Sequence, residues 1–87
     1  MPRYKQVWAE FPREQYNSLP AATQRLIDRR IAELLQDPTG DPDARYYQPH
    51  DEWSIPFTFG DEEGFIYYGV ADEPRRVVIL RRLVFGG

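Results

Sequence analysis

Few side chains in this sequence have the chemistry of a general acid or base. His50 is the only histidine, and histidine is the side-chain type that changes its charge near neutral pH. It stands in residues 48–51, where Pro49 and polar neighbours predict a surface loop. We therefore treat His50 as a candidate proton-transfer group, with an ordinary solvent-facing histidine as the competing interpretation.

Two adjacent arginines, Arg81 and Arg82, are candidates for holding a negatively charged group, because guanidinium N–H groups pair well with carboxylate and phosphate oxygens. Both fall in residues 76–83, whose β-branched residues predict a strand. Neighbouring residues of a strand point to opposite faces, so we expect only one of the two arginines to face a ligand. An ion pair with the acidic residues of 51–63 is the competing interpretation for either one.

Aromatic side chains in the second half of the chain offer flat surfaces for stacking. The residues concerned are Tyr46, Tyr47, Trp53, Tyr67 and Tyr68. Alternation along residues 65–70 puts one of Tyr67 and Tyr68 in the core and the other at the surface, so only one is available to a ligand. Packing in the core or at an interface is the competing interpretation.

Other classes of site are missing from the sequence. It has no glycine-rich phosphate loop, no metal-ligand spacing and no serine–histidine–aspartate combination. It also has no cysteine, which excludes disulfides and thiolate metal sites. We therefore expect no cofactor and no metal. The missing cysteines and the lack of an apolar run of about 18 residues predict a cytoplasmic protein that does not contact membranes.

The charge is unevenly distributed. The net charge is −3, and residues 37–63 carry eight acidic side chains and one arginine. Proteins that bind nucleic acids usually show a basic balance or a basic stripe, because much of their affinity comes from neutralising phosphates. The overall balance therefore argues mildly against nucleic-acid binding.

The first half of the chain predicts a strand and two helices. Alternation in residues 4–9 indicates a strand with Tyr4 and Trp8 towards the core. A short helix at residues 12–18, with Phe11, Tyr16 and Leu19 on its apolar side, is expected to end where Leu19-Pro20 turns the chain. A longer helix comes next and ends at Asp37-Pro38. Its apolar stripe is Ala22, Leu26, Ile27, Ile31, Leu34 and Leu35.

Charged residues beside that stripe suggest ion pairs along the second helix. Arg25 and Asp28, and Arg29 and Glu33, are spaced for contact on one helix face. The turn-forming residues of 37–43 then predict an exposed connection. We expect these two arginines to be neutralised within the helix.

The second half predicts strands joined by turns. Residues 45–48 fit a short edge strand, and residues 53–59 alternate with the apolar side chains on one face. Pro56 cannot donate a ladder hydrogen bond, so we expect this second strand at a sheet edge. Residues 60–64 suggest a hairpin loop, and strands at 65–70 and 76–83 flank a turn at 71–74. The whole chain, residues 1–87, is expected to be one α+β domain.

This order of elements resembles the RelE/ParE superfamily of toxins from type II toxin–antitoxin systems, and the resemblance covers nearly the whole chain. It implies a β-α-α-β-β-β(-β) fold in which two antiparallel helices pack on a small antiparallel meander sheet. The segments that match the family by pattern are residues 4–8, 17–38, 40–45, 53–55, 65–68 and 76–81.

The resemblance also implies a function. Such toxins act on translation, by cleaving mRNA at the ribosome, or on DNA gyrase, and a cognate antitoxin neutralises them. The partners that the resemblance implies are therefore an antitoxin and either the ribosome with mRNA or DNA gyrase, and a homodimer is a further alternative. On this interpretation the chain is a candidate endoribonuclease.

The departures from the family bear on that activity. The RNA-cleaving members carry basic or polar groups where this chain has Ser54, Pro56, Phe65 and Val84. The candidate catalytic residues that remain are two arginines, one tyrosine and one histidine: Arg81, Arg82, Tyr68 and His50. The alternative is a catalytically inactive protein-interaction module that kept the fold.

Overall fold

The computed structural model describes residues 4–71 and 75–86. In chain order the elements are β1 (Lys5–Trp8), α1 (Glu10–Asn17), α2 (Ala21–Leu34), β2 (Arg45–Tyr47), the 3₁₀ turn η1 (Gln48–His50), β3 (Glu52–Phe59), β4 (Glu62–Ala71) and β5 (Val77–Phe85). This is the α+β order that the sequence predicted. No helix in the described residues is long and apolar enough to cross a membrane.

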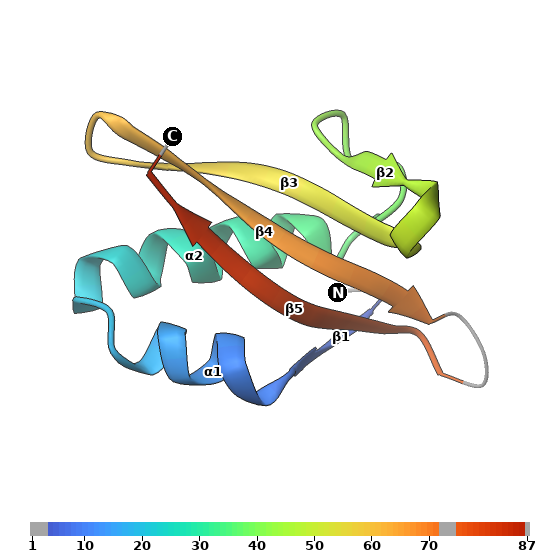
Figure 1. Cartoon of the computed structure of the whole chain (residues 1–87), viewed down its shortest axis with the longest axis horizontal. Helices are drawn as coiled ribbons and strands as arrows, with labels where there is room; N and C mark the ends of the chain where they lie inside the picture. The colour runs from blue at the N-terminus through green and yellow to red at the C-terminus, as the bar shows by residue number, and fades with distance from the viewer. Residues whose placement is uncertain (1–3, 72–74, 87) are drawn as a thin grey trace.

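The strands form one mixed sheet in the order β1-β5-β4-β3-β2 (Figure 1). Strands β2 to β5 form the predicted antiparallel meander. The sequence did not place the first strand in the sheet, and the structure shows β1 parallel to β5. A parallel pair needs a long crossover, and the helices α1 and α2 lie in the connection between these two strands.

The core lies between α2 and the facing side of the sheet. The predicted helix stripe contributes Ile27, Ile31 and Leu34, each at most 1% exposed, while Ala22 at its start is exposed. Opposite them lie Ile55, Phe57, Ile66, Tyr68, Val78, Leu80 and Leu83. We call this side of the sheet the inner face and the opposite side the outer face.

Helix α1 begins two residues earlier than predicted, at Glu10. Pro12 is buried in its first turn, a position where the missing N–H costs nothing. Phe11 does not join the apolar side as expected, since it is 64% exposed. Tyr16 and Leu19 do pack against the core, so the helix is anchored at its C-terminal end.

The ion pairs expected along α2 do not form. Asp28 instead accepts a hydrogen bond from the Tyr16 hydroxyl (2.7 Å), and burial together with this bond raises the pKa of Tyr16 to about 12. Glu33 lies 3.7 Å from Arg30 rather than beside Arg29. Asp28 therefore connects α2 to α1, whereas Glu33 pairs within α2. Arg25 and Arg29 form no ion pair with the described residues.

The segment after α2 is more buried than its composition predicted. Pro38 is fully buried, and its carbonyl accepts a hydrogen bond from the Tyr68 hydroxyl at 2.7 Å. Arg30 forms a bidentate pair with Asp41, at 2.9 and 3.0 Å. This pairing lowers the pKa of Asp41. The connection is therefore fastened to the domain at two points.

Strand β3 is not a complete edge strand, because β2 pairs with its first three residues. At Pro56 this edge of β3 has no partner among the described strands, and the Pro56 carbonyl there accepts a hydrogen bond from Arg30 Nε at 3.0 Å. The backbone N and C=O of one residue point to the same side of a strand. The Pro56 nitrogen therefore faces the unpaired edge, where no strand needs a donor, and the predicted edge position is correct at this residue.

The hairpin between β3 and β4 is tighter than predicted. Phe59 pairs with Glu62, leaving Gly60 and Asp61 as the turn. Gly60 has a φ of 60°, a conformation that glycine adopts without strain. Strand β5 extends to Phe85, two residues beyond the expected end. Most of the predicted 71–74 turn lies outside the described residues.

Candidate functional site

Arg81 and Arg82 both lie on the outer face, although regular alternation predicted opposite faces. The register between β4 and β5 shifts, so that Tyr67 pairs with Arg82 and the next residue, Tyr68, pairs with Leu80. Arg81 is therefore an extra residue in β5, a β-bulge, and alternation restarts after it. Leu80 and Leu83 both return to the inner face and are buried, which leaves the two arginines together on the other side.

Arg82 is surrounded by groups from the neighbouring strands. Its guanidinium carbon lies 4.2 Å from the centre of the Tyr67 ring, a cation–π contact. Its Nη2 lies 2.9 Å from a carboxylate oxygen of Glu52, so the ion pair expected with the 51–63 region does form. The Arg82 side chain is 51% exposed, and the group thus remains accessible to a ligand.

Arg81 extends across β4 towards the end of η1. Its Nη1 donates a hydrogen bond to the main-chain carbonyl of Asp51 at 3.0 Å. Its guanidinium lies against Gly69, with no side chain between them. Arg81 has no carboxylate partner, so its charge is not neutralised by an ion pair with the described residues.

His50 is exposed, as the loop interpretation predicted, and it is the last residue of η1. Its ring packs edge-on against Tyr47, with the ring centres 5.1 Å apart. Tyr47 stands opposite Glu52 in the β2–β3 register. Since Arg81 binds the carbonyl of the residue after His50, the structure brings three of the four candidates to the same end of the sheet.

Tyr68 is the candidate that the structure places elsewhere. It is fully buried on the inner face, and burial raises its pKa well above the ordinary value. Its hydroxyl is committed to Pro38. Alternation correctly gave one buried and one accessible tyrosine, and the accessible one is Tyr67, beside Arg82.

Tyr46 and Trp53 pack together rather than offering a free stacking surface. Their ring centres are 4.8 Å apart, and Trp53 also stacks on Tyr68 at 6.4 Å. The Tyr46 hydroxyl donates to Asp51 Oδ1 at 2.8 Å, which raises the pKa of Tyr46. Trp53 therefore packs on the core, and Tyr46, which is 47% exposed, lies against Trp53 from β2.

The four positions at which the resemblance implied departures from RNA-cleaving proteins, Ser54, Pro56, Phe65 and Val84, lie together on the outer face. The register aligns Ser54, Tyr67 and Arg82 across three strands. It aligns Pro56, Phe65 and Val84 in a second row. The outer face is thus polar and basic near the first row and apolar along the second.

A third cation also belongs to this face. Arg45 in β2 stands opposite Ser54 in register, on the same side of the sheet. It is exposed, and its hydrogen bonds go to main-chain carbonyls of the preceding loop, including that of Ala44 at 3.0 Å. Sequence reasoning treated Arg45 only as part of an edge strand. Its pairing with Ser54 depends on the β2–β3 register, which could not be derived from the sequence.

The outer-face site comprises three arginines, a carboxylate, an imidazole and a half-buried tyrosine: Arg45, Arg81, Arg82, Glu52, His50 and Tyr67. Three arginines on one face suit a polyanion, and the half-buried Tyr67 ring is a candidate for stacking on a base. Glu52 and His50 are the side chains of the site whose types serve as general acids or bases. Sequence reasoning missed Glu52 as a site residue, although alternation in β3 already put it on the face of Ser54. It named Tyr67 as a stacking candidate but chose Tyr68 for the catalytic set.

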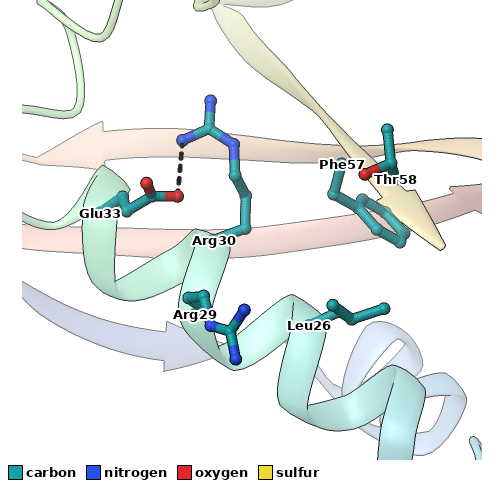
Figure 2. A pocket seen from close by; sticks show the side chains of 6 residues that line it. All are labelled: Leu26, Arg29, Arg30, Glu33, Phe57 and Thr58. Atoms are coloured by element: carbon teal, nitrogen blue, oxygen red, sulfur yellow. Dashed lines mark ion pairs between the residues drawn. The ribbon is translucent and has the colours of Figure 1, made fainter.

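A small cavity of about 180 Å³ lies on the opposite side of the domain, between α2 and the open part of β3. Figure 2 shows Leu26, Arg29, Arg30 and Glu33 reaching it from the helix, with Phe57 and Thr58 on the strand. None of the outer-face site residues lines it. No group of acidic, histidine or cysteine side chains suited to a metal ion occurs among the described residues.

No protein-family model and no curated protein sequence matches this chain. Several solved structures do match this chain. An isolated RelE toxin from E. coli superposes with a TM-score of 0.77 at 18% identity, over 97% of this chain and 85% of that one. The E. coli RelBE toxin–antitoxin complex gives 0.67 at 16% identity, over 97% and 98%. An archaeal RelE–RelB complex from Pyrococcus horikoshii gives 0.63 at 16% identity, over 98% and 97%. The chain therefore has the fold of the RelE toxins.

Proposed function

We propose that this protein is the toxin component of a toxin–antitoxin pair and that it acts on mRNA at the ribosome through its outer face. The observation that carries the proposal is the β-bulge, which turns Arg81 and Arg82 to the same side of the sheet. Two adjacent guanidinium groups on one face can bind neighbouring phosphate oxygens. A regular strand would have separated them.

RNA cleavage by the 2′-hydroxyl requires three things: a base for its proton, cations for the charge that develops on phosphorus, and an acid for the leaving oxygen. In our proposal Arg81 and Arg82 stabilise the charge on phosphorus. Tyr67 stacks on a base beside the cleaved bond. His50 and Glu52 are the candidates for the two proton transfers.

Glu52 has a second consequence for binding. Its ion pair with Arg82 has to open, or be shared, when a phosphate binds the same guanidinium. The pair is partly exposed, so opening it costs little, because such pairs contribute between 0 and about 1 kcal/mol. The released carboxylate is then close to the bound phosphate and suited to accept a proton.

A cognate antitoxin is the proposed protein partner. RelE occurs in complex with the antitoxin RelB in two of the similar structures. The outer face of this chain exposes apolar side chains, Val7 at 48% and Val84 at 36%, beside its arginines. An antitoxin segment with apolar and acidic residues would match such a surface. DNA gyrase is the other target that the resemblance implies and is a second candidate.

A different candidate function is a protein-interaction module without catalysis. The row Pro56, Phe65 and Val84 favours it, because these residues make part of the outer face apolar where a ribonuclease needs polar groups. In that case Arg81 and Arg82 would contact a protein partner. Both functions use the outer face, but only the toxin cleaves RNA.

Induction of the protein alone in growing cells separates these functions. We expect growth arrest, with new 5′ ends within translated mRNA detected by primer extension. The double variant Arg81→Ala/Arg82→Ala should abolish both. The matched control is Arg25→Ala, since Arg25 is an exposed arginine of α2 that forms no ion pair with the described residues. It should behave like the unchanged protein.

Each other outcome points to a specific alternative. Growth arrest without mRNA cleavage, together with inhibited supercoiling by purified gyrase, would favour gyrase as the target. Unaffected growth and intact mRNA would overturn the toxin proposal in favour of the interaction module. Co-expression with the product of the neighbouring reading frame tests the antitoxin: we expect a complex that restores growth.

A further inference from the structure

Gly69 is buried although it belongs to the outer face. It lies between Tyr68, which points to the core, and Val70. The other outward residues of this part of β4, Phe65 and Tyr67, are only half-buried. What covers Gly69 is the guanidinium of Arg81, which crosses β4 at this point.

The guanidinium occupies the position that a side chain at Gly69 would need. A Cβ atom added at Gly69 would lie 2.8 Å from Arg81 Cζ and 3.0 Å from Nε, and it would also collide with Nη2. The glycine is not needed for its backbone freedom, because the positive φ angles among the described residues belong to Asp51, Gly60 and Gly86. The absence of a side chain at Gly69 therefore leaves space for the Arg81 guanidinium.

We propose that Gly69 is a positioning residue for Arg81. Three features hold the Arg81 guanidinium in one position on the outer face: the space above Gly69, the carbonyl of Asp51 and the β-bulge. This inference rests on the proposed function only in assigning Arg81 to phosphate binding. The arrangement of Gly69 and Arg81 itself can be tested without RNA.

The structure offers a contrasting glycine in the same strand. A Cβ at Gly64 would lie 2.7 Å from Cε1 of the buried Phe57 ring and 2.8 Å from the main-chain oxygen of Val84. Neither neighbour can move easily. At Gly69 the obstacle is the far end of a flexible side chain, so Gly69→Ala should leave folding intact while moving the guanidinium.

The experiment compares Gly69→Ala with Gly64→Ala. For Gly69→Ala we expect unchanged thermal unfolding, and we expect the Arg81 Nε–Hε resonance in the NMR spectrum to shift to the position of a solvent-exposed arginine. The resonance is assigned by its loss in Arg81→Ala. Cleavage of mRNA should fall by about 100-fold, the size expected when a group is misplaced by about 1 Å. Gly64→Ala should lower the unfolding temperature instead.

A double variant tests whether Gly69 acts through Arg81. In the Arg81→Ala background, Gly69→Ala should cause no further loss of cleavage. An unchanged Arg81 resonance in Gly69→Ala, or a moved resonance with full cleavage, would overturn the positioning role. Failure of the proposed function looks different: the unchanged protein would not cleave mRNA, and the resonance shift would still report on Gly69.

Discussion

Strand β4 carries two adjacent tyrosines that point to opposite sides of the sheet, and each is close to an arginine–carboxylate pair. On the inner side, burial and the charge of Asp41 raise the pKa of Tyr68, whereas the charge of Arg30 lowers it. On the outer side, Tyr67 lies under Arg82, which is paired with Glu52. The same combination of tyrosine, arginine and carboxylate therefore occurs twice, on the two faces of one strand.

The two sets differ in how completely their hydrogen-bonding groups are used. Arg30 makes three hydrogen bonds, two to Asp41 and one to the Pro56 carbonyl, and its side chain is 15% exposed. Within the described part of the chain Arg82 makes one hydrogen bond, to Glu52, and half of its side chain is exposed. The hydroxyl of Tyr68 is bound to Pro38.

This difference in hydrogen bonding indicates a structural role for Arg30 and a ligand-binding role for Arg82. A guanidinium whose donors are satisfied inside the protein fastens a loop and a strand edge, whereas one with unused donors at the surface can accept a new anion. The inner set should therefore determine stability and the outer set should determine ligand binding. Substitutions in each set, and a change of pH, can break or sharpen that division.

The largest effect is expected at Arg30. Arg30→Met removes the partner of Asp41, whose side chain is 9% exposed, and leaves the Pro56 carbonyl without its donor. Breaking such a pair should cost about 3 kcal/mol of unfolding free energy, measured by urea denaturation. Arg25→Met, at an exposed position, is the control and should change stability by less than about 0.5 kcal/mol. Equal effects would mean that the Arg30 pair is not structural.

Tyr68→Phe should have the next largest effect. It keeps the ring in the core but removes the hydroxyl that binds the Pro38 carbonyl. A buried acceptor left without its partner costs about 1–2 kcal/mol. Tyr67→Phe is the matched variant one residue away and should leave the urea midpoint unchanged. If Tyr68→Phe instead abolished mRNA cleavage in a fully folded protein, our placement of the site on the outer face would be wrong.

The pH dependence of stability should follow Asp41. Arg30 lowers the pKa of Asp41 in the folded state, so this carboxylate stabilises the fold above its ordinary pKa near 4. That contribution is lost as the pH falls through the lowered value. The stability gap between the unchanged protein and Arg30→Met should therefore narrow between pH 7 and pH 3. Urea midpoints across this range give the measurement, and a constant gap would contradict the assignment.

The smallest effect on stability is expected at Glu52. Glu52→Gln removes a partly exposed ion pair and should change the unfolding free energy by less than about 0.5 kcal/mol. It also frees the Arg82 charge, so single-stranded RNA should bind more tightly at low salt, with a steeper salt dependence. Fluorescence anisotropy at several salt concentrations measures both. Weaker RNA binding would show that Glu52 itself supports the ligand.

Most of the fold could be predicted from local patterns. Alternation in β3 correctly gave the buried residues Ile55 and Phe57, and the stripe on α2 gave Ile27, Ile31 and Leu34. These patterns work because one face of each element is buried, which imposes its period on the sequence. The edge position of Pro56 followed from its missing N–H alone.

The site was harder to predict because it depends on pairing between strands. A β-bulge has no signature in β5 itself: Arg81 becomes an extra residue only because Tyr67 and Tyr68 of β4 pair on either side of it. Simple alternation therefore placed one arginine on the wrong face. The same applies to Gly69, whose role is evident only when Arg81 lies across it.

Arg30 was overlooked for a related reason. In the sequence of α2 it is one polar residue among several, and its partner Asp41 lies in a segment whose composition predicts an exposed turn. Local spacing favoured the pairs Arg25–Asp28 and Arg29–Glu33 instead. Contacts across the fold decided the outcome, since Asp28 is bound by Tyr16 and Glu33 is nearest to Arg30.

The position of β5 between β1 and β4 has a consequence for how the protein is made. Lys5 pairs with Val77 and Trp8 with Leu80, so the two strands that join in parallel are separated by about seventy residues of chain. Such distant contacts slow folding, because a long loop must close before they form. During synthesis the sheet stays divided until residues 77–85 have left the ribosome. Arg81 and Arg82 lie in β5, so a nascent chain without residues 77–85 does not yet carry the complete outer face.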